Sequence, residues 1–304
     1  MKISGFTLVR NGVKFDYPFM ESIQSLLPLV DELMINVGYG EDETLKKLEA
    51  FKAQTPQGEK IQLFESEWPL NDPEKKRGGK ILSEQTNLAL DRCTGDWCIY
   101  LQADEVFHEE DSKTLLDAIR TADQRPEVEG ILFDYVHLYG SFDVVQDTRS
   151  AYRREVRAIR RNSGARSVGD AQSFRKPDGS KLKVIRPQVR VFHYGWVRTP
   201  DAMKEKTFFM DQLYHGQTQK NNQGEHTTAT GDNYRYKKFW GLMPFKGTHP
   251  QIMRQRIEAK NWNWDLKKSP LEWHLEDLKK VILDTFERFT GIRLFEYRSY
   301  KLIR

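Results

Sequence analysis

Two adjacent acidic residues, Asp104 and Glu105, are the strongest candidates for chemistry in this sequence. They follow the apolar run 97–101, which predicts a strand that is buried on both faces and ends close to them. Hard cations such as Mg²⁺ and Mn²⁺ prefer oxygen ligands and take only one or two from a protein while substrate phosphates supply others. The pattern therefore predicts a divalent-cation site. The alternative is an acidic turn that begins the next helix.

His193 is a second candidate, because it follows the predicted strand 189–192. A histidine at a strand end can complete the coordination of a cation that Asp104 holds. A histidine beside aromatic residues, here Tyr194 and Trp196, is also a common structural residue. Both interpretations stay open from the residues alone.

Basic residues gather in two segments that suit phosphate groups. Segment 75–80 brings lysines and two glycines to the start of a predicted helix, where backbone N–H groups and positive charge converge. Segment 149–161 carries six arginines, which can bind a diphosphate or an acidic acceptor through paired hydrogen bonds. Neither segment has the spacing of a Walker motif, and both also suit a charged surface in contact with water.

These residues need elements that bring them together, and the first 200 residues supply an alternation of β-rich runs and helical patterns. This alternation predicts βαβ units and a mainly parallel sheet. The expected strands are 3–9, 32–37, 60–65, 97–102, 130–138 and 189–192, and the expected helices are 17–27, 44–52, 109–122 and one that ends near residue 95. Ligands of such sheets bind outside the carboxyl ends of the strands, which draws attention to loops 10–16, 38–43 and 102–108.

Beyond residue 200 the pattern changes to helices over 201–214 and 271–289, with a polar loop at 216–233 between them. The second helix is amphipathic, and we expect its apolar side to pack against the sheet rather than against a membrane. The apolar residues at helical spacing are Leu271, Leu275, Leu278, Ile282, Phe286 and Phe289. We expect the tail 297–304 to be packed as well, with contact to an anionic membrane surface as the alternative.

Composition limits the class of protein. The chain has 304 residues, of which 38% are hydrophobic and 30% are charged, as is typical of a folded protein exposed to water. The formal net charge is only +4, so charge gives no reason to expect nucleic acid as a partner. Cys93 and Cys98 form neither a metal motif nor a redox motif, and no stretch is apolar enough for a signal peptide or a transmembrane segment. These features predict a cytoplasmic protein.

Several segments resemble the family 2 glycosyltransferases, and their order along the chain matters more than any one of them. The segments are 6–11 in the first strand, 30–32 and 42–44 around the second, Asn87 after the basic loop, and 102–105 after the fourth strand. The resemblance implies a GT-A fold, an α/β nucleotide-sugar-binding fold with a mainly parallel central sheet flanked by helices. It covers residues 1–110 and becomes thinner towards residue 200.

The resemblance also implies an activity, an inverting transfer of a sugar from a nucleotide-diphosphate donor to a hydroxyl of a glycan or lipid-linked acceptor. In that family, a strand-end acidic motif holds Mn²⁺ or Mg²⁺ on the diphosphate. This role is carried over to Asp104, Glu105 and His193, while Gln102 replaces the first aspartate of the motif. Asp170 is implied as the base that deprotonates the acceptor. The implied donor-binding residues are Arg10, Asn11, Asp42, Lys80, Asn87, Gln102 and Asp104.

The expected organisation is a catalytic domain over 1–200, with the donor side over 1–110 and the acceptor side over 111–200. A helical extension over 201–304 is expected to pack on it. A bacterial surface glycan is the expected acceptor, reached by a cytoplasmic enzyme that is soluble or in peripheral contact with a membrane. A sugar nucleotidyltransferase is disfavoured, because the residues 10–12 after the first strand lack the Gly-rich basic signature of that class. A non-catalytic nucleotide- or glycan-binding protein on the same fold stays an alternative, consistent with Gln102.

Overall fold

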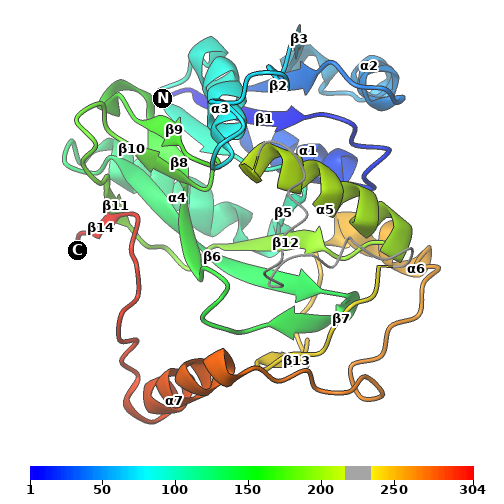
Figure 1. The fold of residues 1–304 in the computed structure, drawn as a ribbon. Coiled ribbons are helices and arrows are strands. Elements are labelled where there is room, and N and C mark those ends of the chain that lie inside the picture. Colours follow the sequence, from blue (N-terminus) through cyan, green and yellow to red (C-terminus); the bar gives the residue numbers. More distant parts are fainter. Residues whose placement is uncertain (216–233) are drawn as a thin grey trace.

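The computed structural model of the protein describes residues 1–215 and 234–304, apart from the side chain of Glu276, and the predicted loop at 216–233 lies outside these residues. The N-terminal part alternates strands and helices as predicted (Figure 1). Its elements are β1 (Ile3–Val9), α1 (Phe19–Leu26), β2 (Glu32–Gly38), α2 (Thr44–Gln54), β3 (Ile61–Ser66), α3 (Lys80–Arg92) and β4 (Trp97–Tyr100). Strand β1 pairs in parallel with β2 and β4, and β2 pairs in parallel with β3. The carboxyl ends of these four strands therefore meet at one edge of the sheet.

The sheet continues beyond β4 as a mixed sheet. The next elements are β5 (Glu105–Phe107), α4 (Ser112–Asp123), β6 (Gly130–Tyr139), β7 (Ser141–Gln146), β8 (Arg154–Arg160), β9 (Arg166–Val168), β10 (Ser173–Arg175), β11 (Lys183–Ile185) and β12 (Arg190–Trp196). Strand β8 is antiparallel to β4 and β6, and β12 is parallel to β6 and antiparallel to β5. The predicted α/β class, with a largely parallel central sheet and flanking helices, is confirmed.

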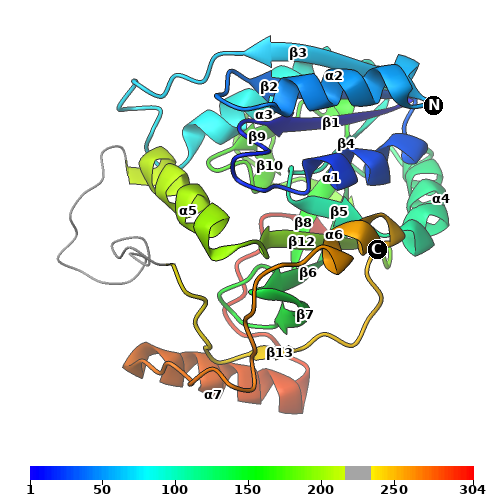
Figure 2. The same ribbon diagram turned by 90° about the vertical axis from the view of Figure 1, so that its right-hand side faces the viewer.

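The C-terminal part adds helices and two short strands. Its elements are α5 (Pro200–His215), β13 (Leu242–Pro244), α6 (Arg254–Glu258), α7 (Leu275–Thr290) and β14 (Lys301–Leu302). Strand β13 pairs with β7, and β14 pairs with β11, so the tail is packed as predicted. Figure 2 shows α5 at the carboxyl ends of the parallel strands and α7 beyond β7 and β13. The division into 1–200 and 201–304 stays a prediction.

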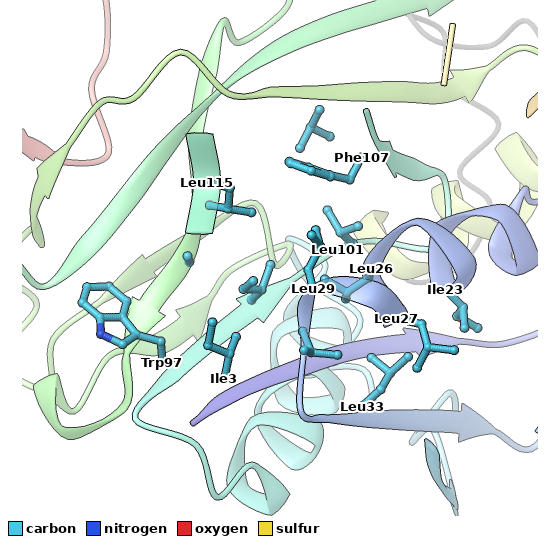
Figure 3. Packing of buried hydrophobic residues seen from close by; sticks show 14 of the residues in the cluster. Ile3, Ile23, Leu26, Leu27, Leu29, Leu33, Trp97, Leu101, Phe107 and Leu115 are labelled. Atoms are coloured by element: carbon cyan, nitrogen blue, oxygen red, sulfur yellow. The ribbon is translucent and has the colours of Figure 1, made fainter. Parts of the chain in front are cut away.

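Side chains alternate between two apolar clusters, one on each face of the parallel strands. On β1, Ile3 and Val9 belong to the cluster under α1 and α4, and Phe6 and Leu8 belong to the cluster under α3. This period of two is that of a strand buried on both faces. Figure 3 shows the first cluster, in which Leu26 from α1 and Leu115 from α4 lie with residues of the sheet. The two clusters hold the strand ends in place.

Helix α7 contradicts the prediction that the apolar side of 271–289 packs against the sheet. The exposed fractions of its apolar residues are large, for example 88% for Leu275, 59% for Ile282 and 87% for Phe289. The physical reason is a set of ion pairs on the opposite side, where Asp284 and Glu287 contact Arg149. The polar side of the helix therefore faces the body of the protein. Among the described residues, no helix is long and apolar enough to cross a bilayer.

Candidate active site

The loops after β1 and β2 are tied together by Asn11. Its side-chain oxygen accepts a hydrogen bond of 2.8 Å from the backbone N–H of Glu41, and its own backbone adopts a left-handed conformation with φ +52°. A side chain at Gly40 would place its Cβ 2.4 Å from the Asn11 oxygen, so only glycine fits there. Arg10, beside Asn11, donates 2.8 Å to the carbonyl of Tyr39. Arg10 and Asn11 thus stand at the edge predicted to bind ligand.

Asp104 lies beyond the end of β4, and basic side chains surround its buried carboxylate. Its Oδ2 is 3.0 Å from Lys206 Nζ and 3.9 Å from Arg198 Nη2, and its Oδ1 is 3.8 Å from His193 Nε2. Burial opposes ionisation, but Lys206, His193 and Arg198 together hold the pKa of Asp104 well below its usual range. The carboxylate is therefore ionised in the folded protein.

Lys206 reaches the site from α5, about a hundred residues after Asp104 in the sequence. Its ammonium donates 3.0 Å to Asp104 and 2.7 Å to the carbonyl of Gly195. Burial lowers the pKa of Lys206 to about 8, with a further contribution from Arg198. Sequence reasoning did not find Lys206 or Arg198, because nothing in the helical pattern of 201–214 marks one lysine among several as pointing inwards.

Glu105, the second acid of the pair, turns away from Asp104 into a buried ion pair. Its Oε1 and Oε2 accept from Arg157 at 2.8 Å and 2.9 Å, and neither side chain is exposed. The Tyr135 hydroxyl and the backbone N–H of Gln102 each donate one more hydrogen bond to this carboxylate, at 2.7 Å and 3.0 Å. Glu105 therefore joins β5 to β8, and these contacts leave it unsuited to hold a metal.

His193 lies inside β12, in register with His137 on β6, rather than after a strand as predicted. The two imidazoles meet through their Nδ1 atoms at 3.0 Å, and His137 Nε2 lies 2.6 Å from the carbonyl of Tyr152. Burial lowers the pKa of His137 to about 3 and also lowers the pKa of His193, so both rings are neutral at pH 7. Two neutral imidazoles in contact fix each other's tautomers.

Asp170 lies in the turn between β9 and β10, in a strained stretch of backbone. Gly169 and Ala171 on either side have φ +60° and +62°, and a left-handed conformation is unfavourable for alanine. The Asp170 carboxylate accepts from the Tyr214 hydroxyl at 3.0 Å and from the backbone N–H of Gln172 at 3.2 Å. Strain of this kind is found at functional sites, where the surroundings enforce it.

Gln102 lies between the two predicted catalytic regions. Its side-chain amide donates 3.5 Å to the carbonyl of Ala171, which ties the Asp170 turn to the loop that carries Asp104. The loops that hold the metal and base candidates are thus in contact, although the two carboxylates come from positions far apart in the sequence.

Three other predicted donor-binding residues make mainly structural contacts or lie at the surface. Asp42 accepts from the backbone N–H groups of Thr44 and Lys14, at 3.0 Å and 2.7 Å, and so begins α2. Asn87 exchanges two hydrogen bonds with the backbone of Ser167, which attaches β9 to α3. Lys80 is exposed at the first position of α3. Their role in donor binding stays a prediction.

Helix α5 lies over the carboxyl ends of the parallel strands (Figure 2). Phe209 stacks on Phe15 with a centroid distance of 5.1 Å and lies 5.2 Å from the Arg10 guanidinium. At the end of α5, the carbonyls of Leu213 and Tyr214 accept from the N–H groups of the glycines at 78–79. A surface hollow of about 620 Å³ beside α3 includes Asn87 but not Asp104. Asp104, which Lys206 of α5 contacts, therefore does not line this hollow.

No protein-family model matches the chain, and no curated protein matches it. Solved structures of TarS from S. aureus are similar to it in part. The TarS 1-349 structure has a TM-score of 0.37 at 14% identity and covers 70% of this chain and 65% of its own. Its complex with UDP-GlcNAc has a TM-score of 0.38 at 13% identity over 70% of this chain and 66% of its own.

A longer TarS chain has a TM-score of 0.38 at 16% identity, and the matched part is 71% of this chain and 40% of TarS. This chain thus spans about two thirds of the shorter TarS structure and well under half of the longer one. Likeness of this size carries no inference about activity. The function has to be argued from the site.

Proposed function

We propose that this protein transfers a sugar from a nucleotide-diphosphate donor to an acceptor hydroxyl. The observation that supports this most directly is the group of polar side chains at the carboxyl ends of β1 and β4, where Arg10 and Asp104 lie beneath α5 and Lys206 contacts Asp104. This edge of a parallel sheet is where nucleotide ligands bind in α/β folds. The resemblance of segment 102–105 to a strand-end acidic motif supports the same reaction class.

Asp104 and His193 offer one oxygen and one nitrogen donor that could hold a divalent cation, and Lys206 occupies Asp104 Oδ2 in the described arrangement. His137 donates through Nε2 to the carbonyl of Tyr152, so its Nδ1 accepts from His193, a tautomer assigned from the hydrogen-bond network. His193 Nε2 is then an acceptor that faces Asp104 Oδ1 across 3.8 Å. The described residues contain no group of three or more His, Cys, Asp or Glu side chains suited to a metal. Asp104 and His193 would hold the ion, and donor phosphates would complete its shell.

A bound Mn²⁺ or Mg²⁺ would act as a Lewis acid that neutralises charge on the leaving diphosphate. The chain itself brings two further cations to this place. Lys206 has its ammonium beside Asp104, and the Arg198 guanidinium lies 3.9 Å from the same carboxylate. Preorganised positive charge of this kind stabilises the charge that grows on a leaving group, and it is usually the largest contribution to such catalysis.

Asp170 is the proposed base of an inverting transfer. Its carboxylate takes the proton from the acceptor hydroxyl while the acceptor oxygen forms a bond to the anomeric carbon. The bond between that carbon and the diphosphate oxygen breaks, and the nucleoside diphosphate leaves from the opposite face. The Tyr214 hydroxyl and the Gln172 N–H orient the Asp170 carboxylate in the structure. We further propose a bacterial surface glycan or lipid-linked acceptor on the cytoplasmic side of the membrane.

Donor entry requires helix α5 to move. In the described arrangement, α5 engages both proposed acids, since Lys206 contacts Asp104 and Tyr214 contacts Asp170. A non-catalytic nucleotide-binding protein is the second candidate function. It is favoured by the contacts of Lys206 with Asp104 and of Tyr214 with Asp170, because these contacts occupy both carboxylates that the transfer would need. Turnover separates the two candidates.

The proposal is tested first by thermal shift with UDP, GDP, CDP and dTDP, each with and without Mn²⁺. A ligand that binds only the folded state raises the melting temperature. We expect a Mn²⁺-dependent rise with one diphosphate, lost in Asp104→Asn and kept in Glu59→Gln, a change at an exposed acid away from the site. No rise with any diphosphate contradicts nucleotide binding. A rise without release of diphosphate from any sugar donor supports the binding protein instead.

A further inference from the structure

We propose that α7 and the segment after it bind the surface of an anionic lipid bilayer. The exposed apolar residues of this region are Leu275, Leu278, Ile282, Phe286, Phe289 and Phe295, hereafter the α7 face, with exposed fractions from 39% to 88%. Folded proteins seldom expose so many large apolar side chains together unless they bind something. Figures 1 and 2 both show α7 at the margin of the molecule, beyond β13.

The orientation of α7 is fixed by its polar side. Arg149 contacts Asp284 at 3.0 Å and Glu287 at 3.1 Å, and it donates 3.0 Å to the carbonyl of Leu283. The side chains of Arg149, Asp284 and Glu287 are only 10–12% exposed. Turning the α7 face inwards would break this group and leave buried charges unpaired, which is strongly unfavourable. The α7 face is therefore held outwards.

The charges around the α7 face favour an anionic partner. Among the described acidic side chains of 275–304, each is in an ion pair and at most 14% exposed; they are Asp277, Asp284, Glu287 and Glu296. Among the side chains that the structure describes on α7 itself, the exposed charged ones are basic, Lys279 and Arg288. The exposed Arg298, Lys301 and Arg304 lie further along the chain, in the tail that forms β14. Exposed apolar residues beside Lys and Arg are the pattern of a helix that lies in the interface of an anionic membrane.

A second copy of this chain fits the α7 face less well than lipid. Two copies that met through this face would bring the same basic residues together, and like charges at an interface are unfavourable. A bilayer surface with anionic headgroups has the opposite charge and an apolar layer beneath it. Helix α7 has 16 residues and is about 24 Å long, enough to lie along such a surface.

The test is flotation of the full chain with two kinds of vesicle, one of phosphatidylcholine alone and one in which about a third of the lipid is phosphatidylglycerol. The second kind carries negative surface charge, and the first does not. We expect binding to the anionic vesicles that weakens as the salt concentration rises. The double variant Ile282→Ser/Phe289→Ser should weaken it by roughly tenfold or more, because apolar contact sets this affinity. The matched control is Leu88→Ser, an exposed apolar residue on α3, 39% exposed, and it should bind like the unchanged protein.

A second double variant tests the contribution of the basic residues on α7. Lys279→Gln/Arg288→Gln should bind anionic vesicles less tightly and lose much of the salt dependence, with no change in its circular dichroism or melting curve. Equal binding by all variants, or no binding by the unchanged protein, overturns the proposal. A dimer in light scattering that Ile282→Ser/Phe289→Ser dissolves, without vesicle binding, overturns it in favour of a second copy. These readouts need no nucleotide, so they are independent of the proposed sugar transfer.

Discussion

At the scale of single residues, Asp170 is the most direct test of chemistry as distinct from binding. Asp170→Asn keeps the size of the side chain and can still accept from Tyr214 and Gln172. We expect donor binding to be unchanged and kcat to fall by about 10²- to 10⁴-fold, as for loss of a general base. The measurement is steady-state transfer alongside the nucleotide thermal shift. Transfer at the original rate would place the base elsewhere.

Glu155 gives the protein a predictable dependence of stability on pH. It is buried on β8, where it accepts from Ser299 at 3.0 Å and from Gln172 at 3.1 Å, and burial raises its pKa to about 7. In an unfolded chain a glutamate has a pKa of about 4.3. Between these values the folded state keeps a proton that the unfolded chain has released, so the free energy of unfolding falls as pH rises.

We expect Glu155→Gln to remove this titration. The variant should gain stability relative to the unchanged protein between pH 5 and pH 8, by roughly 1–3 kcal/mol. Melting curves at several pH values measure the difference. Two curves of melting temperature against pH that run parallel would show that Glu155 does not titrate in this range.

Residue types alone predicted part of the site. Asp104 was found because an unbroken apolar run ends just before it, and such a run fixes where a buried strand stops. His137 and Lys206 were missed, because their contacts with His193 and Asp104 join elements that the sequence separates widely. Glu105 was expected to hold a metal because its ion pair could not be foreseen. Its partner Arg157 lies on a strand about fifty residues further along the chain.

At the scale of elements, helix α5 is the part of the site whose movement the proposed donor binding requires. Phe209 holds it by stacking on Phe15 at 5.1 Å. Phe209→Ala should weaken this contact and increase hydrogen exchange of the amides of 203–214. Because the closed state competes with the donor, the variant should bind its nucleoside diphosphate several-fold more tightly. Unchanged exchange and affinity would mean that α5 does not compete with the donor.

The order of β1 to β4 and their helices was predictable, because strand patterns of period two alternate there with helical patterns. Parallel pairing of such strands then places all their carboxyl ends at one edge of the sheet. Which side of α7 faces the sheet was not predictable. Its apolar residues repeat at helical spacing, but the pattern does not say what they face. Arg149, on the loop after β7, decides the orientation through Asp284 and Glu287, and that pairing spans more than a hundred residues.

At the scale of the whole molecule, the buried pair of Arg157 and Glu105 joins β8 to β5, two strands of the mixed part of the sheet. Both side chains are fully buried, and the two contacts are 2.8 Å and 2.9 Å. Glu105→Gln leaves the Arg157 charge without its partner. We expect a loss of about 3–5 kcal/mol in the free energy of unfolding.

Denaturant unfolding measures this loss, and Asp91→Asn serves as control, since its pair with Arg166 is largely exposed. That control should cost at most about 1 kcal/mol. Equal losses in the two variants would contradict the structural role assigned to Glu105.

The chain between β13 and β14 is anchored at both ends, because β13 adds to β7 and β14 adds to β11. Helix α7 therefore belongs to a segment, the strap, that is attached to the sheet at both of its ends. Detaching α7 from the protein would break the pairing of β13 with β7, the pairing of β14 with β11 and the ion pairs of Arg149. A force on α7, such as one from a bound bilayer, would therefore be distributed over all of these contacts. A dye at Arg304, whose carbonyl accepts from Arg125, would report the position of the sheet, whereas one at Thr285 would travel with the strap.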